Sequence, residues 1–166
     1  MASRRKGRIL AFQALYFWES SEKVSERTYS HVSVEELVGF AWLEDEKKKK
    51  LDEGITAFSS ILVAGTIENI AVIDKTIKDH LDNWDISRVN RVDLAVLRMS
   101  VFSLIFQNDI PPSIVIDEAI GICKDYGTDD SYKFINGVLD GIRKTLQSEN
   151  PAMSAVQGQS ETDKYL

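Results

Sequence analysis

Cationic, amide and aromatic side chains gather near the start of the chain. The members of this group are Arg4, Arg5, Arg8, Gln13 and Tyr16. Arg8, Phe12 and Tyr16 are four residues apart, so a helix would place them along nearly one stripe. Because cations neutralise phosphates and aromatic rings stack on bases, this pattern favours single-stranded RNA as a ligand. The spacing alone leaves Tyr16 open between an RNA contact and the core, and it favours the core for Phe12.

A second cation and aromatic ring are adjacent at Lys133 and Phe134. Phe134, Val138 and Ile142 follow an i, i+4, i+8 pattern, which is typical of the buried face of a helix. This pattern favours the core for Phe134, and contact with RNA stays the alternative.

No catalytic or metal-binding set of residues emerges from the sequence. His31 and His80 lie in different segments without metal-ligand spacing, and Cys123 is the only cysteine. The adjacent acids Asp117–Glu118 and Asp129–Asp130 point in different directions on a helix, and we interpret both pairs as first-turn residues that favour the helix dipole. A phosphate-binding glycine loop is also missing from the sequence. We therefore expect a protein that is not an enzyme and that has no cofactor and no metal.

Composition and charge indicate a globular protein with a local basic patch. The 166 residues are 43% hydrophobic and 28% charged, which is enough for one domain with a substantial core. The net charge of −6 excludes a generally basic nucleic-acid-binding protein. Residues 1–8 nevertheless contain four cations and no acid, so an RNA site would be confined to such a patch.

The basic start followed by the apolar run ILAFQALYFW is similar to a secretory signal. Gln13 interrupts that run, and no small-residue cleavage pattern follows it. The other apolar runs are too short to span a membrane. A lone cysteine is compatible with a reducing compartment, so we expect a soluble, cytoplasmic protein without a membrane partner.

Apolar residues recur mostly at helical spacing, which predicts an all-α fold. The expected helices span residues 3–19, 34–43, 48–64, 66–81, 87–107, about 112–127 and about 128–146. The charge run at 44–50 is interpreted as an exposed helix start, and Gly65 as a break between two helices. The 87–107 helix is apolar on more than one face, which indicates the centre of a bundle.

The end of the chain contains three further signals. Gly127 is expected to end one helix and Thr128 to cap the next, with Gly137 allowing the two to approach closely. Cys123 falls on an apolar stripe and is expected to be an inert core thiol. Residues 147–166 are polar and aperiodic, so they are predicted to be a disordered tail.

Three regions together resemble the NusB family. They are RKGRILAFQALYFWE near the start, VDLAVLRMSVFSLIF with PPSIVIDEAIGICKDYG in the middle, and DDSYKFINGVLDGIRK near the end. Their order and spacing extend the resemblance over residues 3–146, with a divergent segment at about 20–50. The resemblance implies one domain over residues 1–146, built as a helical bundle of two packed three-helix halves.

The resemblance also implies a function in bacterial transcription antitermination. Members of this family bind boxA-type single-stranded RNA of ribosomal RNA leader transcripts jointly with NusE, a small-subunit ribosomal protein, in the transcription elongation complex. The RNA-facing positions of the family fall on Arg4, Arg5, Arg8, Gln13, Tyr16, Lys133 and Phe134. The positions that face NusE fall on Asp93 and Asp130, and Asp93 is shorter than the Glu often found there.

Two other functions are compatible with parts of the pattern. A helical adaptor that binds only proteins would fit the net acidity, whereas the basic start argues against it. NusB-like domains also occur fused to ribosomal RNA cytosine methyltransferases, but this sequence has neither the cofactor-binding glycine loop nor the catalytic cysteine motif of those enzymes.

Overall fold

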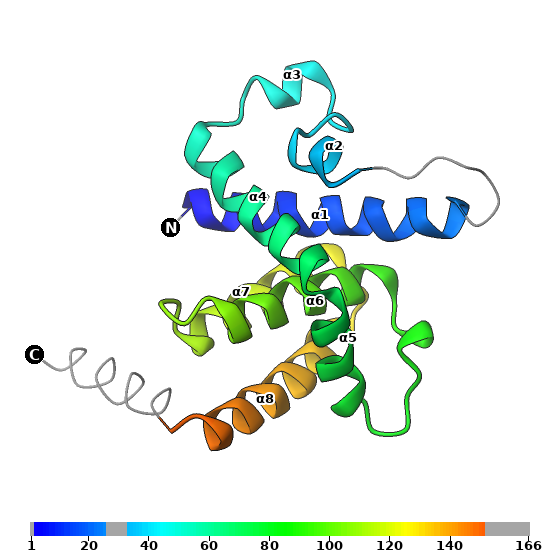
Figure 1. Ribbon diagram of the computed structural model, residues 1–166, viewed down its shortest axis with the longest axis vertical. Coiled ribbons are helices and arrows are strands. Elements are labelled where there is room, and N and C mark those ends of the chain that lie inside the picture. Colours follow the sequence, from blue (N-terminus) through cyan, green and yellow to red (C-terminus); the bar gives the residue numbers. More distant parts are fainter. Residues whose placement is uncertain (1, 26–32, 152–166) are drawn as a thin grey trace, which may run out of the picture.

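The computed structural model describes residues 2–25 and 33–151, with side chains for residues 3–21 and 33–151. In chain order the elements are α1 (Ala2–Ser25), α2 (Val34–Val38), α3 (Asp45–Lys48), α4 (Glu53–Glu68), α5 (Ile70–Asp79), the 3-10 helix η1 (Ile86–Arg88), α6 (Arg91–Phe106), α7 (Pro112–Tyr126) and α8 (Ser131–Glu149) (Figure 1). No strand occurs within these ranges, and the predicted all-α fold is confirmed.

Local capping chemistry explains where several helices begin. Asp52 accepts a hydrogen bond of 2.8 Å from the Ile55 N–H at the start of α4, and Asn90 accepts one of 2.9 Å from the Val92 N–H at the start of α6. Pro112 occupies the first turn of α7, where its missing N–H costs nothing. These short-range signals are the part of the fold that the sequence encodes most directly.

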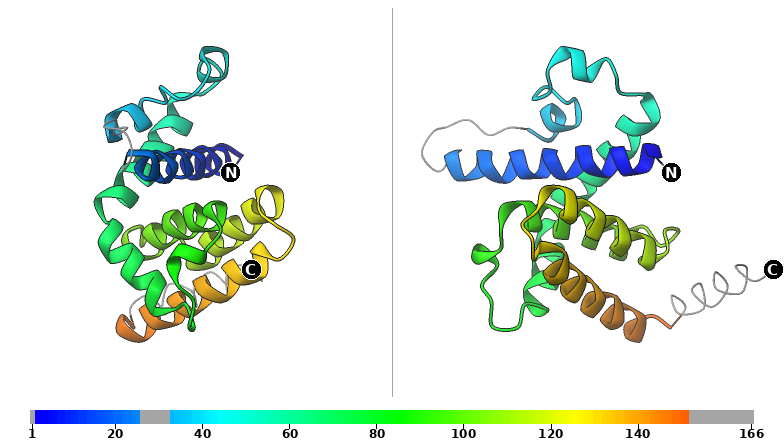
Figure 2. Two further views of the ribbon diagram at one scale, coloured as in Figure 1. Left: turned by 90° about the vertical axis from the view of Figure 1, so that its right-hand side faces the viewer. Right: turned by 180° about the vertical axis from the view of Figure 1, so that it is seen from behind.

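The helices form two groups that meet at α6. The first group is α1, α2 and α4, and the second is α5, α6, α7 and α8. Helix α6 packs against members of both groups, while α1 and α8 lie on opposite sides of it (Figures 1 and 2). Every residue from Asp93 to Leu104 is buried, which confirms the central position predicted for this helix. Because α5 packs with the second group, the division into two three-helix halves is not confirmed.

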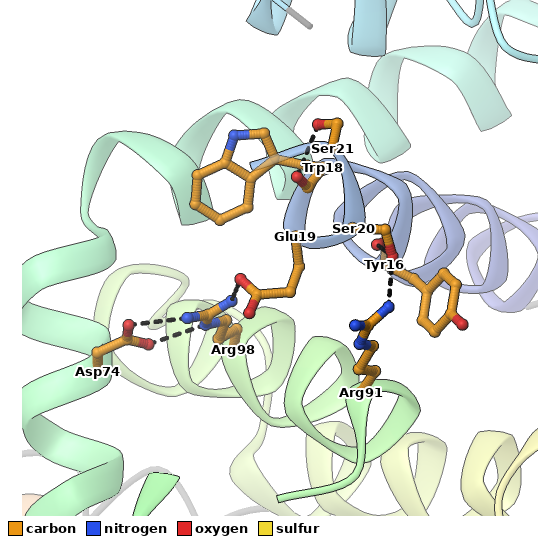
Figure 3. A network of polar contacts seen from close by, with 8 residues as sticks. All are labelled: Tyr16, Trp18, Glu19, Ser20, Ser21, Asp74, Arg91 and Arg98. Atoms are coloured by element: carbon orange, nitrogen blue, oxygen red, sulfur yellow. Dashed lines mark hydrogen bonds and ion pairs between the residues drawn. The ribbon is translucent and has the colours of Figure 1, made fainter. Parts of the chain in front are cut away.

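A buried arginine joins the two groups. The Arg98 side chain on α6 is only 10% exposed, and its guanidinium donates two 2.9 Å hydrogen bonds to the two carboxylate oxygens of Asp74 on α5. A third 2.9 Å bond reaches Glu19 on α1, and the Trp18 ring lies 5.8 Å from the guanidinium carbon (Figure 3). The network therefore fixes α1, α5 and α6 relative to one another.

Two glycines have roles other than those predicted. Gly65 lies inside α4, and a Cβ there would collide with the Phe102 ring of α6, so its function is close packing. The break between α4 and α5 falls instead at Asn69, whose side chain bonds back to the Gly65 carbonyl at 2.7 Å. The position of a Cβ at Gly137 has no neighbouring group within 4 Å among the described residues. The predicted close helix approach at Gly137 is therefore wrong.

Several predicted boundaries and placements also change. Helix α1 runs on to Ser25 and α8 to Glu149, so the first residues of the predicted tail are helical, while 152–166 lie outside the described residues. Gly127 has φ −90°, so α7 ends without the left-handed turn that usually makes a glycine necessary. Asp117 and Glu118 follow the first turn of α7, and Asp129 and Asp130 precede α8, so neither acid pair occupies the first turn predicted for it. Phe12 and Cys123 are buried, as predicted.

No single helix in the described part of the chain is long and apolar enough to cross a membrane. Among the described residues, α4 and α5 taken together are the one pair that reaches that length and composition, and they are bent by 76° relative to each other.

Candidate nucleic-acid interface

Two of the N-terminal arginines contact one aromatic ring. The guanidinium carbons of Arg4 and Arg8 lie 5.4 Å and 5.2 Å from the centre of the Phe58 ring on α4. Gly7 makes room for this ring, because a Cβ at Gly7 would come within 2.7 Å of it. Arg4 is exposed, whereas Arg8 is only 5% exposed. Arg4 therefore presents its charge to solvent, and Arg8 does so only through the cavity described next.

Arg8 and Arg4 border a cavity of about 380 Å³ between α1 and the start of α7. Burial lowers the pKa of Arg8, and the charge of the nearby Glu118 partly opposes that shift. The acids Asp109 and Asp117 line the same cavity, so its electrostatic character is mixed. The predicted basic group is therefore partly neutralised where it meets α7.

Arg5 ties α1 to α7. Its guanidinium lies 2.9 Å from an Asp125 carboxylate oxygen and 3.5 Å from a Glu118 oxygen, and it rests against the backbone of Gly121. The side chain is still 38% exposed. A phosphate that binds Arg5 must therefore compete with two carboxylates that already hold it.

Tyr16 and Gln13 lie near the surface of α1. Tyr16 is 39% exposed and lies beside Arg91 in Figure 3, while Gln13 is half-buried. Phe12 instead packs edge-on against Tyr126 of α7, with ring centres 5.2 Å apart. The structure thus separates the two aromatic residues of the stripe, with Tyr16 at the surface and Phe12 in the core.

A cationic and aromatic cluster lies where α7 ends and α8 begins. The ammonium groups of Lys124 and Lys133 lie 5.0 Å and 5.9 Å from the centre of the Tyr132 ring. Tyr126, at the end of α7, is 46% exposed. We call these four side chains the α7–α8 cluster. Lys124, Tyr126 and Tyr132 were not predicted as site residues, because residues on two different helices give no local spacing signal.

Phe134 combines features of the two alternatives that the sequence left open, a core residue and a residue that can contact RNA. It packs against the hydrophobic core, as its spacing favours, but it is only half-buried. The remaining part of its side chain borders a second cavity of about 370 Å³, which Trp84 and Lys133 also line. Its ring is therefore held by the core and reachable from outside.

The two acids expected to face a partner protein are placed very differently. Asp130 is exposed just before α8. Asp93 is 5% exposed, and its Oδ1 has no hydrogen-bond partner within the described ranges. Burial raises the pKa of Asp93, and the Ser131 hydroxyl at the start of α8 partly opposes that shift. Asp130 is thus accessible to a partner, whereas Asp93 lies between α6 and α8.

Contacts between helices place two of the predicted residues, Arg5 and Lys133, near the end of α7. Arg5 and Phe12 of α1 contact Asp125 and Tyr126 at the end of α7, and the α7–α8 cluster continues from there to Lys133. Arg4 and Arg8 instead lie toward the start of α7. Three cations, from Arg5, Lys124 and Lys133, and the exposed Tyr126 ring therefore lie on neighbouring parts of α1, α7 and α8, together with the acid Asp125.

Comparisons with known proteins give a consistent result. The family whose sequence pattern matches residues 5–144 is the NusB family. A transcription antitermination protein NusB of Treponema denticola is 52% identical over 140 residues, covering 84% of this chain and 95% of that protein. The corresponding protein of Treponema pallidum (strain Nichols) is 44% identical over 142 residues, covering 86% and 93%.

Solved structures show the same likeness. The NusB structure from T. maritima has a TM-score of 0.72 and 34% identity, covering 85% of this chain and 90% of that one. A crystal structure described as antitermination factors NusB and NusE in complex with double-stranded RNA contains a chain with a TM-score of 0.69 and 28% identity. That match covers 87% of this chain and 98% of the other.

Proposed function

Because this chain belongs to the NusB family of transcription antitermination proteins, we propose that it binds boxA-type single-stranded RNA of ribosomal RNA leader transcripts jointly with NusE. The proposed activity is binding rather than catalysis. Its ligands are an RNA strand and a small ribosomal protein, and its setting is the transcription elongation complex. No resident cofactor or metal is part of the proposal.

The observation that carries the RNA part of the proposal is the grouping of two lysines with two tyrosines where α7 ends and α8 begins. The Lys124 and Lys133 ammonium groups lie 5.0 Å and 5.9 Å from the centre of the half-buried Tyr132 ring, and Tyr126, two residues after Lys124, is exposed. Single-stranded RNA needs cations for its phosphates and rings for its bases. Asp125, Asp129 and Asp130 lie in the same segment, so the two lysines would act through direct contacts with phosphates and not through a positive field, on a protein whose net charge is −6.

The roles of individual residues follow from their accessibility. We assign phosphate contacts to Arg4, Arg5 and Lys133, and base stacking to Tyr16 and Phe134. The Arg8 side chain is buried, so we propose that it supports the phosphate-contacting residues through the electrostatic field of its charge and through its contact with Phe58. Gln13, half-buried on the same helix, is the proposed hydrogen-bonding group.

The NusE part of the proposal is supported by the related complex of NusB, NusE and RNA. Asp130 is the better candidate for a direct NusE contact, because it is exposed at the start of α8. Asp93 is buried, so we propose that it acts on the partner surface by holding α8 in place through Ser131.

The RNA preference is tested by fluorescence anisotropy. A labelled single strand carrying the boxA sequence is titrated with the full chain, beside a scrambled strand of the same composition. We expect tighter binding to boxA, and Arg4→Glu with Arg5→Glu should abolish binding to both strands. Equal affinity for the two strands would contradict boxA recognition. If the wild type binds neither RNA nor NusE, both the RNA-binding proposal and the adaptor alternative are contradicted. If it binds NusE but neither RNA strand, the adaptor alternative is favoured.

A further inference from the structure

The cavity beside Phe134 has a second wall that the proposed RNA contacts do not use. Its volume is about 370 Å³, within the range of roughly 300–1,000 Å³ found for small-ligand sites. One wall is the connection between α5 and α6, and the other is the outer face of α8. The lining groups that matter here are Asp82, Trp84, Lys133, Phe134 and Gly137.

Trp84 is exposed to an unusual degree for so large an apolar side chain. At 60% it is the most exposed large hydrophobic residue in the described ranges. Burying an indole of this size contributes strongly to a core or an interface, so its position at a cavity mouth favours a binding role.

The backbone around Trp84 is held in place before any ligand arrives. The His80 ring lies 2.7 Å from the Thr76 carbonyl oxygen and 2.9 Å from the Thr145 hydroxyl, which fixes the connection to α8. Asn83 adopts a left-handed conformation with φ 61°, which Asn tolerates better than most residues. Asp85 accepts a 2.9 Å hydrogen bond from the Ser87 N–H. Such preorganisation reduces the entropy cost of binding.

The opposite wall of the cavity, on α8, includes the exposed Gly137. No group in the part of the chain that the structure describes lies within 4 Å of the Cβ position there. Lys133 and Phe134, one turn earlier on α8, stand at the same cavity. Gly137 is exposed and borders this cavity, so no side chain projects into the cavity from that position.

We propose that this cavity is a nucleobase subsite, in which one RNA base lies between the Trp84 indole and the Phe134 ring. The Lys133 ammonium neutralises the adjoining phosphate, and the Asp82 carboxylate accepts a hydrogen bond from an exocyclic base amine. The occupant is RNA because the cavity shares Lys133 and Phe134 with the proposed RNA surface. The inference rests on that proposed function and extends it by adding Trp84 and Asp82.

The test uses the full chain with the labelled boxA strand and three variants. Trp84→Leu removes the stacking face but keeps an apolar side chain, and it should weaken RNA binding by roughly 5- to 150-fold. Trp84→Phe retains an aromatic face and should restore most of that affinity. Phe106→Leu is the matched control, because Phe106 is an exposed aromatic residue, 45% accessible, that does not line this cavity. Its RNA affinity should equal that of the wild type.

A set of strands with one abasic position each locates the base. The wild type should bind one of the abasic strands more weakly than the complete strand. Trp84→Leu should bind that abasic strand and the complete strand with equal affinity. Wild-type RNA binding that Trp84→Leu leaves unchanged would overturn the subsite alone. If Trp84→Leu loses NusE binding but keeps its RNA affinity, the nucleobase subsite is also overturned, because the cavity would then be a protein-binding site. A wild type that binds none of the strands would contradict the proposed function as a whole.

Discussion

At the scale of single residues, burial decides which charged and aromatic side chains can meet a ligand. Tyr16 and Phe12 belong to one stripe of α1, yet Tyr16 is 39% exposed and Phe12 only 3%. Arg4 and Arg8 share one aromatic ring, yet only Arg4 is open to solvent. The residue types indicate the chemistry, and the packing selects the members that perform it.

Replacing Tyr16 tests the stacking role directly. Tyr16→Ala should weaken binding to the boxA strand by about 1–3 kcal/mol, because one base loses its aromatic partner. Phe17→Ala is the matched control, since Phe17 is a 40% exposed neighbour whose ring stacks on Trp42 instead. Anisotropy titrations should show the loss only for Tyr16→Ala. An equal loss of RNA affinity in the two variants would contradict a base-stacking role specific to Tyr16.

Asp93 should make the folded state less stable as pH rises. Its pKa is raised mainly by burial, so the folded protein holds a proton that the unfolded chain releases. The contribution is fully favourable below the ordinary pKa of Asp and is lost as pH increases through the raised value. Asp93→Asn, which cannot ionise, should therefore gain stability relative to the wild type with increasing pH.

Urea unfolding of both proteins between about pH 3 and pH 8 measures this difference. Taking the variant relative to the wild type cancels the opposite contributions of carboxyls with lowered pKa, such as Asp140, which Arg143 and Lys144 hold ionised. A stability difference that does not change with pH would show that Asp93 titrates as in the unfolded chain.

The sequence could supply the chemistry of the candidate site but not its exposure. Arg8, Phe134 and Asp93 carry the predicted chemical groups, yet the structure buries them wholly or partly. Burial depends on which helices pack together, and a single sequence carries that information only through averaged periodicity. The contact between Lys124 and Tyr132 likewise arises because the end of α7 lies beside the start of α8.

At the scale of elements, α6 determines how the other helices are placed. Its apolar residues on more than one face predicted a central helix, and α1, α4, α5, α7 and α8 all pack against it. Helix boundaries were predictable where caps and prolines mark them, as at Pro112. The break at Asn69 was not predictable. Gly65 suggested an earlier break, but its role is to let the Phe102 ring of α6 pack closely against α4.

The Arg98 network should be essential for joining α1, α5 and α6. Arg98→Met leaves the Asp74 carboxylate half-buried without its bidentate partner, which should lower the free energy of unfolding by about 3–5 kcal/mol. Lys75→Ala is the control, because it breaks an exposed 2.7 Å pair with Asp79 on the same helix and should have no measurable effect. Equal urea midpoints for Arg98→Met and the wild type would contradict a structural role for the network.

Two glycine-to-alanine changes should act in opposite directions. Gly65→Ala places a methyl group against the Phe102 ring and should destabilise the protein by about 1–3 kcal/mol. Gly137→Ala meets no neighbour among the described residues and should stabilise α8 by about 0.5–1 kcal/mol. Thermal unfolding compares them, and destabilisation by both would show that Gly137 is needed for packing.

At the scale of the whole molecule, a net charge of −6 is combined with a concentrated set of cations and rings. The acidic body disfavours non-specific binding to nucleic acid, so the proposed RNA recognition would depend on the local arrangement at α1, α7 and α8. Asp130 adds an exposed acid at the edge of that arrangement, where a partner protein and RNA could meet. The proposed joint binding of RNA and NusE would use this surface.

The central claim is that RNA and NusE bind this protein jointly. The most direct measurement is the affinity for the labelled boxA strand with and without saturating NusE, beside the scrambled strand. We predict that NusE strengthens binding to boxA by at least about fivefold, the lower end of ordinary coupling between two sites, and has less effect on the scrambled strand. Identical boxA affinity with and without NusE would contradict the account.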